Sequence, residues 1–288
     1  MPTLGAKDTL FSTKTTVNCR GKLLSLEAPL VMGILNVTPD SFYAGSRLST
    51  VEAVLQKAET MLQDGADILD IGGYSSRPGA ADIPVQEELD RVAPAVEAIV
   101  RNFPEAVVSV DTFRAAVAEA AVAAGGAIIN DISGGNLDEA MFPTVARLQA
   151  PYILMHMRGT PQTMTTLAKY DDIAVEVVDE LQGQVARLKQ LGVKDIILDP
   201  GFGFAKTVDQ NFELLRRLDE LRVFGLPVLA GLSRKSMVYK TLGIAQADAL
   251  TGTIALNMVA LMKGAAILRV HDVKETKQTV ELYKKTIL

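Results

Sequence analysis

Eight short apolar segments, separated by longer amphipathic ones, are the feature of this sequence that most limits how it can fold. Each segment is rich in branched aliphatic residues and is bounded by glycine, proline or polar residues. Such segments are typical of parallel strands that are buried on both faces of a sheet. The segments are 31–38, 67–73, 106–112, 127–134, 151–157, 195–201, 227–233 and 265–272.

The stretches between these segments have the spacing of helices. In 172–192, Ile173, Val177 and Leu181 begin a series of apolar residues at three- to four-residue steps. Eight strand-then-helix units in a row predict an α/β fold, a (β/α)8 TIM barrel formed as a single domain by residues 31–288. A doubly wound open sheet is the alternative, but it more usually has about five to seven strands. Residues 1–30 precede the first unit, and we expect this N-terminal extension to cap the bottom of the barrel.

Composition excludes several classes of protein. The net charge is -5 and no strongly basic segment is present, so nucleic acid is not an expected partner. The single cysteine, Cys19, cannot form an intrachain disulfide and suits a reducing, cytoplasmic location. The first residues lack the apolar core of a signal peptide. The most apolar late stretch, 254–270, is interrupted by Asn257, Lys263 and Arg269, so we expect no membrane span.

Polar side chains gather where the predicted strands end. Buried strands rarely contain such residues without a reason, yet seven of the eight segments end in them. They are Asn36, Asp111, Asn130, Asp131, His156, Asp199, Ser233, Arg234, Lys235, Ser236, Arg269 and His271. A single Asn or Asp at such a place is often only a strand-end cap. The carboxyl ends of barrel strands meet at one mouth, where barrel active sites lie, so the set predicts an active site.

The types of these residues indicate what the mouth binds. Asp111, Asn130 and Asp199 offer hydrogen-bond acceptors and an amide, which suit a flat, nitrogen-rich heterocycle. Positive charge suited to phosphate comes from Arg77, Lys235, Arg269 and His271. Ser236 follows the seventh segment, where a helix start would leave N–H groups free for another anion. We therefore expect a polar heterocycle, a phosphate group and a second anion.

Other chemistries are less well supported. The stretch GGYSSRPG, 72–79, matches neither a Walker loop nor a dinucleotide-binding glycine motif. Two histidines on distant strands are poor support for zinc, whereas a magnesium site that combines Asn36 with substrate phosphates suits that ion. Lys235 could form a Schiff base, as in barrel aldolases, although its neighbours Arg234 and Ser236 fit anion binding at least as well.

The motifs, taken together, resemble those of dihydropteroate synthases. They are GILNVTPDSF, DIGGYSSRPGA, SVDTFR, IINDISGG, LMHMRGTPQTM, LDPGFGFAKT, GLSRKSM and LRVHDV, and they run in order from about residue 30 to the C-terminus. The resemblance implies a transferase of folate biosynthesis and a sulfonamide target. This enzyme joins 6-hydroxymethyl-7,8-dihydropterin pyrophosphate to 4-aminobenzoate and releases pyrophosphate. The resemblance also implies a dissociative mechanism, in which a pterin cation forms before the amine attacks.

The resemblance implies roles for individual residues. The catalytic residues would be Asp111, Asp199, Lys235 and Arg269. The pterin would contact Asp111, Asn130, Met155, Asp199, Gly203, Phe204 and Lys235. The 4-aminobenzoate and the substrate loops, 38–47 and 74–80, would involve Asp40, Phe42, Ser76, Arg77, Pro78 and Ser236. Pyrophosphate would be held by Asn36, Arg77, Arg269 and His271, with Asn36 also the ligand of Mg²⁺.

Further expectations come from the same resemblance. The family implies a homodimer, formed through the apolar helix predicted at 248–263, and sulfonamides as inhibitors. Tyr74 departs from the pattern, because the family most often has Glu at this position, and Ser76 replaces the usual Thr. The main alternative is a pterin-binding methyltransferase barrel of the methyltetrahydrofolate:corrinoid type, which has no need for the SRKS and RVHDV phosphate groups. Another is a catalytically inactive pterin-binding domain, although no polar residue is missing from the mouth.

Overall fold

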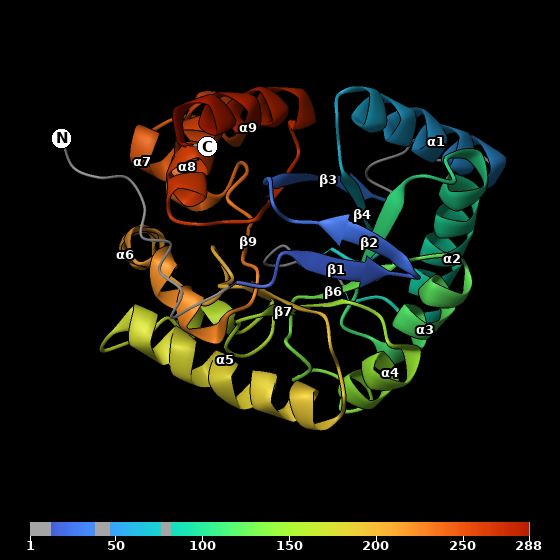
Figure 1. The fold of residues 1–288 in the computed structure, drawn as a ribbon, viewed down its shortest axis with the longest axis horizontal. Coiled ribbons are helices and arrows are strands. Elements are labelled where there is room, and N and C mark those ends of the chain that lie inside the picture. The colour runs from blue at the N-terminus through green and yellow to red at the C-terminus, as the bar shows by residue number, and fades with distance from the viewer. Residues whose placement is uncertain (1–12, 38–46, 76–81, 288) are drawn as a thin grey trace.

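A single barrel of parallel strands surrounded by helices dominates the computed structural model, which describes residues 13–37, 47–75 and 82–287 (Figure 1). The strands are β1 Thr16–Cys19, β2 Lys22–Ser25, β3 Leu30–Asn36, β4 Ile68–Gly72, β5 Val107–Asp111, β6 Ile128–Asp131, β7 Tyr152–Met155, β8 Ile196–Asp199, β9 Leu229–Ala230 and β10 Ile267–Val270. The α-helices are α1 Arg47–Gln63, α2 Val85–Asn102, α3 Ala115–Ala123, α4 Met141–Leu148, α5 Ile173–Gln190, α6 Val208–Arg216, α7 Ser236–Leu242, α8 Leu250–Met262 and α9 Val273–Ile287.

The eight parallel strands are hydrogen-bonded in the order β8-β7-β6-β5-β4-β3-β10-β9. A parallel bridge between Leu198 and Val228, with a hydrogen bond of 2.9 Å from the Leu198 N–H to the Pro227 carbonyl, joins the two outer strands of this list. The sheet thus closes on itself, and the predicted (β/α)8 TIM barrel is confirmed. Each of the eight predicted segments overlaps one of these strands, and β3 begins one residue before its segment.

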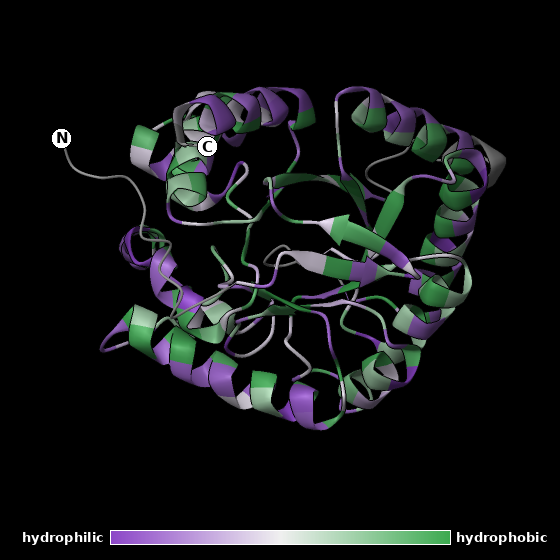
Figure 2. Cartoon of the chain, in the orientation of Figure 1, coloured by the Kyte–Doolittle hydropathy of each residue, from purple (hydrophilic) through white to green (hydrophobic). Residues whose placement is uncertain are grey.

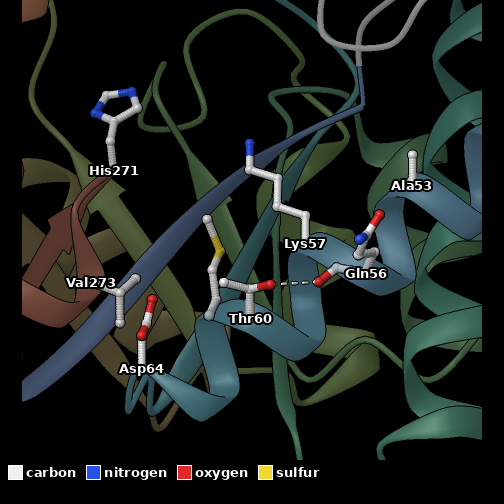
Figure 3. Close-up of a pocket in the computed structure, with 8 residues that line it drawn as sticks. Ala53, Gln56, Lys57, Thr60, Asp64, His271 and Val273 are labelled. Carbon is white, nitrogen blue, oxygen red and sulfur yellow. Dashed lines mark hydrogen bonds between the residues drawn. The ribbon is translucent and has the colours of Figure 1, made fainter.

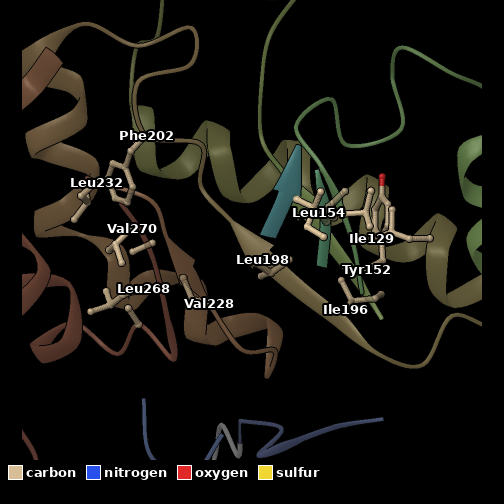
Figure 4. Packing of buried hydrophobic residues seen from close by; sticks show 14 of the residues in the cluster. Ile129, Tyr152, Leu154, Ile196, Leu198, Phe202, Val228, Leu232, Leu268 and Val270 are labelled. Atoms are coloured by element: carbon tan, nitrogen blue, oxygen red, sulfur yellow. The ribbon is translucent and has the colours of Figure 1, made fainter. Parts of the chain in front are cut away.

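The helices pack their apolar faces on the outside of the barrel. Leu69 and Ile71 on β4, for example, belong to the same buried cluster as Val177 and Leu181 on α5. Figure 4 shows part of this cluster, where Ile129, Leu154 and Leu198 lie between strands and helices. The helices carry hydrophilic as well as hydrophobic residues, as expected of helices with one buried face (Figure 2).

Alternate residues of each strand point into the barrel, as the two-residue period of a strand requires. The first inward residues, such as Met32, Ile68, Val107 and Ile197, form a second apolar cluster. Val17 and Cys19 of the β1–β2 hairpin, like Leu26, belong to the same cluster. The hairpin therefore packs against the amino-terminal ends of the strands, opposite the end where the polar side chains lie.

Candidate active site

The inward positions nearest the carboxyl ends of the strands are polar. Strand register places Asn36 beside Gly72, Gly72 beside Asp111, and Asp111 beside Asn130. Across the barrel, Asp199 is paired with Met155. Because these positions are inward-facing neighbours in adjacent strands, the sequence-predicted residues of β3, β5, β6 and β8 come together at one mouth.

Arg269, from β10, is the centre of a hydrogen-bonded network at this mouth. Its Nε donates to Asp70 Oδ2 at 2.6 Å, and its Nη2 donates to Asp111 Oδ2 at 2.6 Å. Asn130 Nδ2 also donates to Asp70 Oδ2, at 3.0 Å. Arg269 is therefore held between carboxylates of β4 and β5, and the nearby acidic groups keep its pKa above the usual arginine value despite burial.

Asp70 is a site residue that the sequence reasoning missed. Its side chain is 0% exposed, and Oδ1 has no hydrogen-bond partner within the part of the chain that the structure describes. A carboxylate only accepts hydrogen bonds. Asp70 therefore holds the Asn130 amide with its Nδ2 towards Asp70. The amide oxygen is left to accept a hydrogen bond from a ligand. Asp70 lies two residues before Gly72 on the same face of β4, so the two-residue period was the signal that could have found it.

Burial and charge oppose one another at the two predicted pterin carboxylates. Burial raises the pKa of Asp111 to about 7, and the guanidinium of Arg269 acts in the opposite direction. Burial likewise raises the pKa of Asp199, whereas Lys235 lowers it. Asp199 Oδ1 also accepts a 2.7 Å hydrogen bond from the Gly201 N–H, which orients the carboxylate at the strand end. The mouth therefore holds its negative charges next to fixed positive ones.

Lys235 lies just before α7, and its side chain reaches the turn that follows the neighbouring strand β8. Its Nζ donates to the carbonyl of Phe202 and lies 4.9 Å from the centre of the Phe204 ring. Burial lowers the pKa of Lys235 to about 8, and Asp199 opposes this shift. A Cβ at Gly203 would lie 3.2 Å from Lys235 Cδ, so the glycine makes room for the lysine stem.

An apolar wall borders the polar ring. Met155 and Ile132 are buried in a small cluster against which Phe204 and Phe113 pack. A planar heterocycle held by Asp199 and Asn130 would have this wall on one side. Met155 thus lies near Phe204, and both Gly203 and Phe204 lie near Lys235.

His156, which sequence reasoning included with the mouth, points out of the ring. Its Nδ1 lies 2.9 Å from Lys206 Nζ and its Nε2 lies 2.9 Å from Glu180 Oε2 on α5. Lys206 Nζ also donates to the carbonyls of Gly201 and Phe204, at 3.1 and 3.0 Å. Three acceptors around Nζ favour the ammonium form, although burial lowers the pKa of Lys206 to about 7. These contacts fasten the turn that carries Gly203 and Phe204.

Other predicted polar residues also have structural contacts. Asp131 accepts from the Tyr152 hydroxyl at 2.6 Å, on the helix side of β6. Arg234 pairs with Asp272 through two hydrogen bonds of 2.7 and 2.9 Å, so its charge is already matched. His271 lies beside Ser233, whose Oγ is 3.0 Å from the ring Nδ1.

The residues predicted to act in the substrate loops lie largely outside the described residues. This applies to Asp40, Phe42, Ser76, Arg77 and Pro78. Tyr74, at the edge of the second loop, is described: its ring meets that of Phe113 edge-on with centres 5.0 Å apart, and the Arg114 guanidinium lies 5.3 Å from the centre of the Tyr74 ring. Arg114 in turn pairs with the buried Glu88 at 2.9 Å.

No acidic, histidine or cysteine cluster suited to holding a metal ion by itself is present among the described residues. Within the same ranges, no helix is long and apolar enough to cross a membrane. A barrel whose mouth combines buried carboxylates, an amide, a lysine and an arginine is suited to an enzyme that binds a polar heterocycle with anionic groups.

Comparisons with known proteins identify that class further. A family model described as "Pterin binding enzyme" matches residues 32–271. The dihydropteroate synthase of Escherichia coli K12 is 44% identical over 270 residues, covering 93% of this chain and 95% of that protein. The chain therefore belongs to the dihydropteroate synthase family, which consists of transferases of folate synthesis.

Solved structures agree with this assignment. The Xanthomonas albilineans dihydropteroate synthase with 4-aminobenzoic acid has a TM-score of 0.88 and 40% identity, covering 95% of this chain and 98% of that one. The Yersinia pestis dihydropteroate synthase in complex with a sulfonamide drug also has a TM-score of 0.88, with 43% identity and coverage of 94% and 98%.

Proposed function

We propose that this chain condenses 6-hydroxymethyl-7,8-dihydropterin pyrophosphate with 4-aminobenzoate to give 7,8-dihydropteroate and pyrophosphate. The observation that carries the proposal is the network of Asp70, Asp111, Asn130 and Arg269 at the barrel mouth, facing Asp199 and Lys235. Its carboxylates and amide suit the N–H groups of a pterin, and its cations suit a diphosphate. The membership of the chain in the dihydropteroate synthase family supports the same reaction.

In this proposal the pterin is held by groups on opposite sides of the mouth. Asp111 and Asp199 accept ring N–H groups, and the oxygen of the Asn130 amide accepts another. Met155 and Phe204 pack against the ring, and Lys235 contacts its edge from above Phe204. The Asp111 carboxylate faces both Arg269 and the proposed pterin. When the pterin binds, this carboxylate either gives up its hydrogen bond from Arg269 or accepts hydrogen bonds from both groups.

The diphosphate end would meet Arg269, His271 and Asn36. We infer that Mg²⁺ assists here. A Cβ at Gly72 would lie 3.4 Å from Asn36 Oδ1 and 3.8 Å from Asp111 Oδ2, so the glycine leaves open space beside the amide oxygen. One oxygen ligand from protein, with the rest from phosphates and water, is a normal arrangement for this ion. When bound, the ion neutralises charge on the phosphates.

The reaction proposed is dissociative. The bond between the pterin methylene and the phosphate oxygen breaks first, and the electron pair leaves with pyrophosphate. Asp111 and Asp199 stabilise the resulting pterin cation through preorganised negative charge. The amine of 4-aminobenzoate then forms the new C–N bond and loses a proton to the released pyrophosphate. The proposed substrate loops, 38–47 and 74–80, would keep water from capturing the cation.

We propose that the 4-aminobenzoate carboxylate binds near Ser236, the first residue of α7, where backbone N–H groups are free of helical partners. The related structures, one with 4-aminobenzoic acid and one with a sulfonamide drug, support this substrate and these inhibitors. Loop residues Asp40, Phe42, Ser76, Arg77 and Pro78 complete this side of the site in the proposal, with Arg77 also reaching the pyrophosphate.

Two broader features are also proposed. We expect a homodimer in which α8 contributes to the interface, because Val259 and Met262 on this helix are exposed. Light scattering of the purified protein should give twice the chain mass, and Met262→Glu should shift it towards one chain mass. A cytoplasmic location fits the free thiol of the buried Cys19.

The test is an assay with pterin pyrophosphate, 4-aminobenzoate and Mg²⁺, with dihydropteroate detected by mass. Asp111→Ala and Lys235→Ala should lower turnover by orders of magnitude while circular dichroism stays unchanged. Near-normal turnover in either variant would refute its assigned role. Methyl transfer from methyltetrahydrofolate to a corrinoid protein, without dihydropteroate formation, would favour the methyltransferase alternative.

A further inference from the structure

A groove of about 480 Å³ lies on the outer flank of the mouth, between α1 and the start of α9 (Figure 3). It is lined by Ala53, Gln56, Lys57, Thr60, Met61, Asp64, His271 and Val273. His271 is shared with the proposed pyrophosphate site, whereas the α1 residues belong to none of the contacts described above. The groove therefore borders the proposed pyrophosphate site at this histidine.

Lys57 and the ring of His271 lie at the same end of this groove. Figure 3 shows Lys57 extending from α1 towards the same end as the His271 ring, with Asp64 at the other end. Lys57 is exposed, and no described acidic side chain forms an ion pair with it. An unpaired ammonium beside a histidine of the proposed phosphate site is suited to a phosphate group.

The electrostatics of His271 show that several cations act on the same place. Desolvation and then Arg269 lower its pKa, Asp272 raises it, and Arg234 and Lys57 lower it further. Arg234 is already matched by Asp272 through an ion pair of 2.7 Å. Arg269 is likewise paired, with Asp70 and Asp111, so Lys57 is the cation acting on His271 that has no described acidic partner and can meet a bound anion.

Hydrogen bonding also prepares His271 to donate. The His271 backbone N–H donates to Ser233 Oγ at 3.2 Å, and this hydroxyl lies 3.0 Å from the ring Nδ1. With its oxygen accepting from the backbone, the hydroxyl can donate its own hydrogen to Nδ1. The ring hydrogen then resides on Nε2, where it can be donated to an anion in the groove.

We propose that the α1–α9 groove binds pyrophosphate on its way out of the active site, with Lys57 as a product-binding residue that acts together with His271. The inference rests on the proposed function, since it takes the leaving group of that reaction as its ligand. The departing diphosphate would pass from Arg269 to the pair formed by Lys57 and His271, and from there to solvent. A volume of about 480 Å³ is in the range of small-ligand sites and leaves room for water around the ion.

The direct test is calorimetric titration of inorganic pyrophosphate into wild-type protein and into Lys57→Met. The affinity of the variant should be about tenfold weaker, which is the effect of losing one charge-assisted contact. Lys57→Arg should restore most of the affinity. Lys189→Met removes an exposed lysine of α5, far from the groove lining, and serves as the matched control with unchanged affinity.

A second measurement uses the fact that the chain has only two histidines. In nitrogen-15 spectra of the imidazole rings, pyrophosphate should shift the resonances of His271 and raise its pKa, leaving buried His156 unaffected as an internal reference. Lys57→Met should require about tenfold more pyrophosphate for the same shift.

Product inhibition separates this inference from the proposed function. Pyrophosphate should inhibit dihydropteroate formation by Lys57→Met about tenfold more weakly than it inhibits the wild type, with the KM for 4-aminobenzoate unchanged. Wild-type affinity and wild-type inhibition in this variant would overturn the groove proposal even if the wild type makes dihydropteroate. Failure of the wild type to make dihydropteroate would overturn the reaction itself, whatever the groove binds.

Discussion

At the scale of single residues, Asp70 connects the two halves of the candidate site. One carboxylate oxygen accepts from Arg269 at 2.6 Å and from Asn130 at 3.0 Å. It thereby orients the guanidinium expected to face the diphosphate and the amide expected to face the pterin. Asp70 is not expected to touch the reacting atoms, so its contribution is one of positioning.

Asp70→Asn keeps the shape of the side chain but removes its charge and makes the orientation of the two facing amides ambiguous. We expect kcat/KM for the pterin pyrophosphate to fall about tenfold to a hundredfold, because charge-assisted hydrogen bonds are lost. The KM for 4-aminobenzoate should change little. Steady-state kinetics with each substrate varied in turn measure this split.

Asp131→Asn is the matched control, because Asp131 is also a fully buried carboxylate at a strand end. Its partners are Tyr152 and two backbone N–H groups on the helix side of β6. This control should lose thermal stability and keep its kinetic constants. Equal effects of the two substitutions on the pterin constants would show that Asp70 acts only through stability.

At the scale of elements, the turn after β8 is held by one buried lysine. Lys206 donates to the carbonyls of Gly201 and Phe204 and to His156 on the neighbouring strand segment. The same turn supplies the Phe204 wall and the Phe202 carbonyl that holds Lys235. The position of the pterin wall therefore depends on contacts that lie outside the barrel interior.

Lys206→Met should loosen this turn, because two carbonyls lose their donor and the replacement side chain offers none. We expect a lower melting temperature and a higher KM for the pterin pyrophosphate, with little change for 4-aminobenzoate. Thermal denaturation and kinetics of the variant are compared with Lys194→Met, which alters an exposed lysine before β8. A melting temperature and KM equal to the wild type would contradict the role given to Lys206.

Strand periodicity explains how far the site could be predicted from sequence. Residues at the ends of strands, such as Asp111 and Asp199, stand out because an apolar run stops there. Asp70 lies inside its apolar segment. Only its spacing of two residues from Gly72, at the end of the strand, indicates that both face the barrel interior. His156 lies next to the end of its segment but has the opposite parity from Met155, which turns it towards α5.

Contacts between segments far apart in the chain are the part of the fold that the local sequence pattern could not predict. The order of apolar and amphipathic segments predicted the barrel, because each unit reads as a strand and its helix. Nothing local in 196–199 or 227–230 indicates that these outer strands meet and close the sheet. The contact between Lys206 and His156, which are 50 residues apart in the sequence, likewise forms only in the folded protein.

At the scale of the whole molecule, His156 links folding stability to pH. Burial and then the charge of Lys206 lower its pKa to about 4, against an ordinary value of 6.5. Between these values the unfolded chain binds a proton that the folded chain does not. The contribution of neutral, buried His156 to the free energy of unfolding is therefore fully present above pH 6.5, and it is lost as the pH falls towards 4.

We expect this one residue to account for up to about 3 kcal/mol of the loss in unfolding free energy across that window. Urea unfolding at pH 7 and at pH 5 should show a clear fall for the wild type and a smaller fall for His156→Gln. Identical pH dependence in the two proteins would mean that other groups cause the acid sensitivity.

The central claim is that this barrel mouth releases pyrophosphate from a dihydropterin and joins the pterin to an aromatic amine. The most direct measurement is the stoichiometry of the two products when wild-type protein is incubated with the pterin pyrophosphate, labelled 4-aminobenzoate and Mg²⁺. We expect equal amounts of labelled 7,8-dihydropteroate and pyrophosphate, and neither product above background with Asp111→Ala. Well-folded wild-type protein that forms no labelled dihydropteroate would contradict it.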